Sequence, residues 1–175
     1  MHDSVFVWNC RFPWLSTSAR EQFSKYATYF SGFLFGVGWW LFIDGLVIAK
    51  NTPDFGIKIG FEDWVPGILA TIGMIITNSI DMSLISDDNS FEYGGSRLAS
   101  RVKLLLFIGI ALIAGGIAGS FAILVIKYLG NETGKNVIYT GLTGVAQTIL
   151  ISISSFVLWL FNKSESSTEF NFVLQ

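Results

Sequence analysis

The sequence predicts an all-α integral membrane protein: a four-transmembrane-helix bundle with a short amino-terminal amphipathic helix. Of its 175 residues, 51% are hydrophobic and only 14% are charged, whereas soluble domains usually carry roughly 25% charged residues. Four apolar runs reach the about 17–25 residues that a membrane-spanning helix needs. These runs are apolar on all faces and lack the alternation of a strand, so we predict helices.

The four predicted spans cover residues 29–49, 64–80, 104–126 and 137–161, and the second is the shortest. Together they form a membrane domain, residues 29–161, between a cytoplasmic amino-terminal segment, 1–28, and a cytoplasmic tail, 162–175. The longest apolar run before the first span is only "VFVW". We therefore expect the first span to act as its own insertion signal.

The distribution of basic residues predicts the orientation of the spans. An even number of spans places both termini on one side of the membrane. Seven Lys and Arg residues fall on that side, in the amino-terminal segment, the middle loop and the tail, and four fall in the two other loops. The positive-inside rule then places both termini in the cytoplasm.

The segment before the first span has one apolar stripe of helical spacing. Ser18 and Glu21 have capping-box spacing, which predicts that a helix starts there. It is either an amphipathic helix in the membrane interface or a cytoplasmic extension of the first span. The members of the stripe are Leu15, Ala19, Phe23, Tyr26 and Phe30.

The charge and residue inventory argues against several function classes. A net charge of −2 gives no electrostatic attraction for nucleic acid. Cys10 is the one cysteine, so the chain cannot form an internal disulfide or a thiolate zinc cluster. His2 is the one histidine, so we expect no histidine triad or metal site. We predict no catalytic residue, no cofactor and no metal, in a protein that is not an enzyme.

Three polar residues lie inside the predicted spans. Asp44, in "GWWLFIDGLVIA", lies roughly 9 Å below the Lys50 end of its helix at a rise of about 1.5 Å per residue. An acid at this depth costs a few kcal/mol unless it faces protein or water. Asn78 is expected in the opposite leaflet, and Gln147 near the midplane, where it can bond a neighbouring helix.

These polar groups are scattered in depth rather than aligned as a relay. We therefore predict a structural or partner-contact role for Asp44, Asn78 and Gln147. The alternative is a small proton- or ion-coupled transporter or channel in which Asp44 is the titrating site.

Small residues predict where helices approach closely. Ala111, Gly115 and Gly119 form a small-xxx-small ladder in the third span, and Gly32 and Gly36 form a shorter one in the first. We expect the ladders to serve packing within the bundle and contact with a partner helix. The Gly115/Gly119 ladder is the predicted partner contact, because the third span has the most small residues.

Two tryptophans, Trp39 and Trp40, lie too deep in the first span for an interfacial aromatic belt. Trp40 is one turn from Asp44, so its indole lies on nearly the same face. We expect bulky packing against small residues elsewhere, with ligand binding as the alternative.

The runs "YFSGFLFGVGWWLFIDGLVIAK", "FEDWVPGILATIGMIITNSID" and "LLLFIGIALIAGGIAGS" resemble the transmembrane protein 50 family. The "RFPW" leader, "DWVP" and "NSI" are similar to its fungal branch. The resemblance covers nearly the whole chain from Arg11 to Phe161. Its most specific piece is the tandem aromatic pair followed four residues later by an acid, here Trp40 and Asp44.

This resemblance implies a non-enzymatic, four-span subunit of endosomal and vacuolar membranes. It implies a role in moving cargo from the late endosome to the vacuole, alongside the multivesicular-body machinery. It also implies a sorting complex with a second small four-span protein, vacuolar protein sorting-associated protein 55 of the leptin receptor overlapping transcript family.

Overall fold

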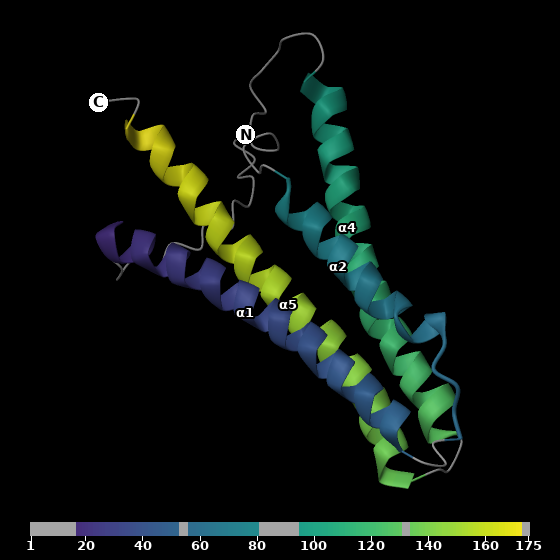
Figure 1. Cartoon of the computed structure of the whole chain (residues 1–175). Coiled ribbons are helices and arrows are strands. Elements are labelled where there is room, and N and C mark those ends of the chain that lie inside the picture. Colours follow the sequence, from purple (N-terminus) through teal and green to yellow (C-terminus); the bar gives the residue numbers. More distant parts are fainter. Residues whose placement is uncertain (1–16, 53–55, 81–94, 131–133, 173–175) are drawn as a thin grey trace.

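The computed structural model describes residues 17–52, 56–80, 95–130 and 134–172 of the chain (Figure 1). Every regular element in these ranges is a helix, as predicted. The elements, in chain order, are α1 (Thr17–Asn51), the 3₁₀-helix η1 (Phe61–Asp63), α2 (Val65–Asn78), α4 (Gly95–Ile123), the π-helix η2 (Leu124–Leu129) and α5 (Gly134–Phe172).

The helices of the described part of the chain form two antiparallel pairs, α1 with α5 and α2 with α4. Figure 1 shows α1 beside α5, and α2 beside α4, with the start of α1 and the end of α5 at the same end of the bundle. α5 also contacts α2 and α4, so it is the central helix. Accordingly, 44% of the most apolar stretch of α5 is buried, against 22% of the corresponding stretch of α1 and 17% of that of α4.

Among the described residues, three helices are long and apolar enough to cross a membrane: Lys25–Asn51, Ser100–Leu129 and Asn136–Leu160. They contain the first and third predicted spans and nearly all of the fourth. The second predicted span is present as α2, whose 14 residues measure about 21 Å, less than the about 30 Å of a hydrocarbon core. The membrane domain is therefore all-helical, and a fourth crossing stays a prediction.

The first and last helices, α1 and α5, extend beyond the predicted spans. α1 is one uninterrupted helix from Thr17, close to the predicted capping position, and α5 continues to Phe172. Helix thus covers part of the predicted tail, 162–175. Leu15 lies outside the described residues, as do the side chains of Ala19 and Phe23, so an interfacial helix there stays a prediction.

Local signals explain where the helices begin and end. At the end of α1, the Thr52 hydroxyl donates to the Ile48 carbonyl at 2.8 Å and accepts from the Asn136 amide at 3.2 Å, which ties the first helix to the last. Gly56 in the following loop has φ 70°, a left-handed conformation that glycine adopts without strain. Pro66 lies in the first turn of α2, where its missing N–H is not needed.

Candidate functional site

An acidic turn precedes α2. The backbone N–H of Gly60 donates to Asp63 Oδ2 at 3.0 Å, and this bond orients the carboxylate within the η1 turn. Asp63 is only 7% exposed. A carboxylate this buried requires charge or hydrogen-bond partners, and they come from the far end of α4.

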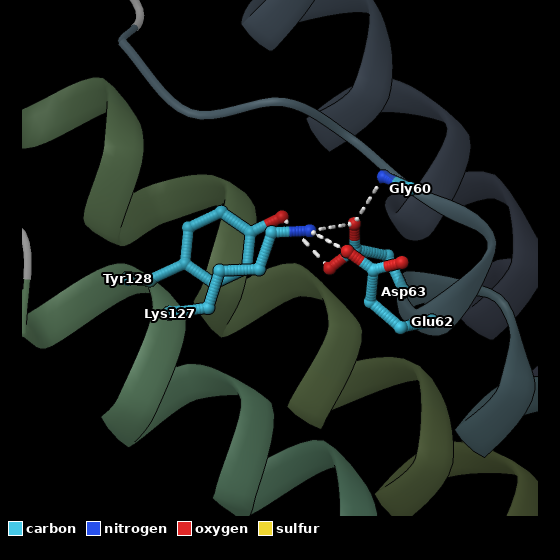
Figure 2. Close-up of polar contacts among 5 residues, drawn as sticks. All are labelled: Gly60, Glu62, Asp63, Lys127 and Tyr128. Atoms are coloured by element: carbon cyan, nitrogen blue, oxygen red, sulfur yellow. Dashed lines mark hydrogen bonds and ion pairs between the residues drawn. The ribbon is translucent and has the colours of Figure 1, made fainter.

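The π-helix η2 supplies these partners. Its register is shown by the Gly130 N–H, which donates to the Val125 carbonyl five residues back at 3.1 Å. Two consecutive residues of η2, Lys127 and Tyr128, reach the acidic turn (Figure 2). Such π turns are rare and frequently mark functional positions in helices.

The resulting acidic cluster consists of Glu62, Asp63, Lys127 and Tyr128. The Lys127 ammonium donates to Asp63 Oδ2 at 2.5 Å and to Glu62 Oε1 at 2.8 Å, and the Tyr128 hydroxyl donates to Asp63 Oδ1 at 3.1 Å. Glu62 is exposed, and the hydrogen bond from Lys127 holds the pKa of its carboxyl below the usual value of 4.5. The cluster joins the start of α2 to the end of α4.

The acidic cluster satisfies its charges internally rather than offering them to a ligand. Both oxygens of Asp63 accept hydrogen bonds, and the Lys127 ammonium forms an ion pair with each of the two carboxylates. Among the described residues, no group of three or more His, Cys, Asp or Glu side chains is placed to hold a metal ion. The acidic cluster therefore acts as a structural link between helices at the edge of the membrane domain.

Asp44 has a polar partner that sequence reasoning missed. The Tyr139 hydroxyl on α5 donates to Asp44 Oδ2 at 3.0 Å, and the pair is exposed on the outside of the bundle. The expectation of polar groups scattered in depth, with none level with Asp44, is therefore wrong for Tyr139. The sequence contained the signal for this pair. Tyr139 lies near the start of the last predicted span, and because that span is antiparallel to the first, its start is level with the end of α1.

Asp44, Gln147 and Asn78 lie at three different levels along the bundle, in the order that the sequence predicted. The Asn78 amide donates to Ser155 Oγ at 3.1 Å, sixteen residues and about 24 Å along α5 from Tyr139. Asn78 and Asp44 are thus well separated along α5, and their placement in opposite leaflets stays a prediction. Gln147 lies midway between Tyr139 and Ser155 and is 1% exposed. Its amide lies against Gly67 of α2, where its Nε2 has no hydrogen-bond partner.

A row of hydroxyls along α5 provides bonds between helices. Ser31 on α1 and Ser154 exchange hydrogen bonds, with each hydroxyl donating at 2.9 Å to the carbonyl of the other residue. Ser120 on α4 and Thr148 lie 2.9 Å apart, hydroxyl to hydroxyl. Three further bonds to α1 and α2 follow the same row: Thr140 to the Gly45 carbonyl, and Thr77 and Asn78 to Ser155. Apolar membrane helices gain specificity from such bonds.

The glycines in close internal contact differ from those in the predicted ladders. A Cβ on Gly38 would lie 3.3 Å from the Gln147 carbonyl oxygen, and one on Gly45 would collide with Thr143. A Cβ on Gly109 would lie 2.7 Å from Thr77 Cγ2, and one on Gly116 would lie 2.8 Å from the Pro66 carbonyl oxygen. Helix packing therefore uses these four glycines.

The predicted ladders face outward instead. Gly32, Gly36 and Gly115 have no atom within 4 Å of an added Cβ, and Ala111 is exposed. Gly119 is partly covered, with Pro66 Cγ at 3.7 Å. The expected packing role inside the bundle is thus wrong for the outward-facing positions of both ladders, and their role as partner contacts stays a prediction.

The two tryptophans of the first span, Trp39 and Trp40, have different surroundings. Trp39 lies 6.3 Å from both Phe42 and Trp64, ring centre to ring centre, so it joins the aromatic contact between α1 and α2. Trp40 is 73% exposed on the outer surface. Packing of Trp40 against small residues is therefore not found within the described part of the chain.

Comparison with known proteins identifies the family of the chain. A model of the family described as "Uncharacterised protein family (UPF0220)" matches residues 3–167. The chain belongs to this family. The matched range covers the helices of the bundle up to residue 167, so the similarity is not confined to one motif.

Three UPF0220-like relatives match over most of their length. A UPF0220 protein of Schizosaccharomyces pombe is 35% identical over 96% of this chain and 96% of its own. Vacuolar protein sorting-associated protein 68 of Saccharomyces cerevisiae is 30% identical over 99% and 97%, and the Transmembrane protein 50 homolog of Dictyostelium discoideum is 32% identical over 87% and 98%. The predicted resemblance to the transmembrane protein 50 family and its fungal branch is confirmed. No solved structure matches the chain.

Proposed function

We propose that this protein is a non-enzymatic membrane subunit of the vacuolar protein sorting pathway, acting in transport from the late endosome to the vacuole. The observation that carries the proposal is the similarity to Vacuolar protein sorting-associated protein 68, which spans 99% of this chain. The polar groups described above support it, because they connect helices to one another. We place the protein in endosomal and vacuolar membranes.

The proposed assembly contains four crossings with both termini in the cytoplasm. The start of α2 is bonded to Lys127 and Tyr128, and Tyr128 packs against Val137 at the start of α5. The end of α2 is bonded to Ser155, eighteen residues and about 27 Å further along α5. Together with η1, α2 thus reaches across nearly the same thickness as its neighbours. This supports a short second crossing surrounded by protein.

A topology experiment tests the crossing number. Tags at the two ends should both be digested when protease is added to sealed, right-side-out endosomal vesicles, and a lumenal tag at the reporter position 58 should be protected. Protection of the carboxyl-terminal tag together with the tag at position 58, with the amino-terminal tag digested, would mean that α2 does not cross, and would overturn this topology.

The proposed complex contains a second small four-span membrane protein, vacuolar protein sorting-associated protein 55 of the leptin receptor overlapping transcript family. The family resemblance supports this partner. Co-purification of the tagged chain from mild detergent tests it. Recovery of the chain without that protein, under conditions that preserve other membrane complexes, would contradict the partnership.

The test of the sorting role is complementation. Saccharomyces cerevisiae cells lacking Vacuolar protein sorting-associated protein 68 should regain correct retention of a soluble vacuolar hydrolase when this chain is expressed. The Asp44→Asn chain should restore retention equally well, because asparagine keeps the shape and hydrogen bonding of the side chain. Unrestored retention, from a chain that reaches endosomal membranes in normal amounts, would contradict the proposal.

The rival function is a proton- or ion-coupled transporter that uses Asp44. Asp44 lies with Tyr139 on the outer surface, apart from the buried hydroxyl row of α5. Transport paths need several polar groups that line one cavity. A pH-dependent flux in liposomes that Asp44→Asn abolishes would favour this rival.

A further inference from the structure

One face of α1 points away from the rest of the bundle. Its residues recur at spacings of three, four, four and three, which keeps them on one side of a helix. The buried residues of α1, among them Ser31, Gly38 and Gly45, occupy the opposite side and contact α5. The α1 outer face consists of Phe33, Gly36, Trp40, Asp44 and Val47, all of them exposed.

The Asp44 carboxylate is the reason to expect a binding partner on the α1 outer face. Asp44 lies seven residues inside the end of α1, and an ionisable side chain in a membrane span is costly unless it meets protein or water. A carboxylate can accept about four hydrogen bonds. The described residues of the chain supply one, from Tyr139, and that pair is itself exposed.

The shape of the face fits a helix. Phe33 and Trp40 project on either side of Gly36, with 64% and 73% of their surfaces exposed. No atom lies within 4 Å of a Cβ added to Gly36, so the glycine leaves an open notch between the two aromatic side chains. A notch of this kind lets a second backbone approach closely, which is how helices associate in lipid.

We infer that the α1 outer face docks a transmembrane helix of another polypeptide, and that this helix places an amide or basic side chain at the depth of Asp44. The donor would complete the hydrogen bonding of the carboxylate, and the helix would enter the notch at Gly36. The inference rests on the proposed association with a second membrane protein, but it does not depend on the sorting role.

A second copy of this chain does not fit the same face. Two copies insert in the same orientation, so a twofold contact between their α1 helices sets identical residues at the same depth. Asp44 would then face Asp44 of the other copy, and like charges repel. The outward-facing Gly115 ladder on α4 offers close approach without a polar group to select a partner. The structure therefore favours α1 over the third span for docking.

Site-specific photocrosslinking in native membranes tests this inference. The photoreactive residue p-benzoylphenylalanine replaces Trp40 in the full-length chain, and in a control it replaces Phe121, which is also exposed. The two positions lie at similar depth, because Gly38 contacts Gln147 and Ser120 contacts Thr148 on the same helix. We expect Trp40 to crosslink to a polypeptide, and the mapped peptide to be a transmembrane helix with Lys, Arg, His, Asn or Gln about one turn from the crosslink.

Variants of the face connect the crosslink to its chemistry. Asp44→Leu should lower the yield about three- to fifteen-fold, the range expected for one hydrogen bond between membrane helices, whereas Asp44→Asn should keep most of it. Gly36→Leu should also lower the yield while leaving the chain's own Tm unchanged, because it fills only the outward notch. The yield at Phe121 should not change in any variant.

Other results would overturn the docking surface. Crosslinks from Trp40 to lipid alone, to a second copy of the chain, or to a helix without an amide or basic side chain near the crosslink each contradict it. An unchanged yield in Asp44→Leu contradicts it as well. If the chain restores sorting while Trp40 meets only lipid, the docking inference fails and the sorting role stands.

Discussion

The acidic cluster gives a quantitative prediction about the stability of the bundle. Lys127→Met removes the cation that faces Asp63, a buried carboxylate with 7% exposure. Removing one partner of a buried ion pair costs about 3–5 kcal/mol. The Lys127 side chain is 16% exposed, and Asp63 retains the Gly60 and Tyr128 donors. We therefore expect a cost at or below the lower limit of this range, about 2–3 kcal/mol.

The assay is thermal unfolding of the purified protein in mild detergent. A loss of 2–3 kcal/mol corresponds to a decrease in Tm of about 4–12 °C for a chain of this size. Glu62→Gln is the matched control, because Glu62 contacts the same ammonium but is exposed, with 59% of its side chain accessible. Its Tm should stay close to that of the unmodified protein, since exposed ion pairs add little.

A double variant separates charge from packing. Asp63→Asn combined with Lys127→Met leaves no buried charge, so it should be more stable than Lys127→Met alone. Equal Tm losses in Lys127→Met and Glu62→Gln would refute this reasoning, as would a double variant less stable than the sum of its parts. Either result would mean that Asp63 does not depend on Lys127.

Three further predictions use the same unfolding assay. Gly45→Ala should destabilise the chain by about 1–3 kcal/mol, because the added methyl group collides with α5. Gly36→Ala, on the open side of the same helix, should be neutral or slightly stabilising. Equal effects of the two substitutions would contradict the α1–α5 contact. Ser154→Ala should lower the free energy of unfolding by about 0.6–1.7 kcal/mol. Ser152→Ala should lower it less, because the Ser152 hydroxyl bonds within α5. The reverse order would contradict the bond between Ser154 and Ser31. The pKa of Glu62 is lowered in the folded state, so its contribution to stability is complete above about pH 4.5 and is lost as the pH falls through the lowered value. Over this acid range, the Tm of Glu62→Gln should decline less than that of the unmodified protein. Equal declines would contradict the lowered pKa of Glu62.

The sequence allowed the helices and their polar depths to be predicted. Apolar runs of spanning length identify helices because lipid leaves a backbone no other way to satisfy its hydrogen bonds. Depth then follows from a fixed rise per residue and from alternating helix directions. This is why Asn78 was correctly separated from Asp44, and why Gln147 lies midway between their contact points on α5.

The choice of packing faces could not be predicted in the same way. Small residues occur on several sides of α4, so spacing alone does not distinguish Gly115, which faces outward, from Gly116, which contacts α2. The selection depends on hydroxyl partners such as Thr148, contributed by a helix later in the chain. The acidic cluster was missed for a related reason, since a loop and a π turn 64 residues apart bring Asp63 to Lys127.

The central position of α5 constrains how the bundle is assembled during synthesis. α5 is the last helix made, yet the bonds from Ser31, Thr77 and Ser120 to other helices all end on it. Until α5 enters the bilayer, these hydroxyls lack their final partners, and the close contacts at Gly38 and Gly45 cannot form. A ribosome that stops before residue 134 therefore releases helices that insert but cannot complete the bundle. Such products lack the bonds between helices that α5 supplies.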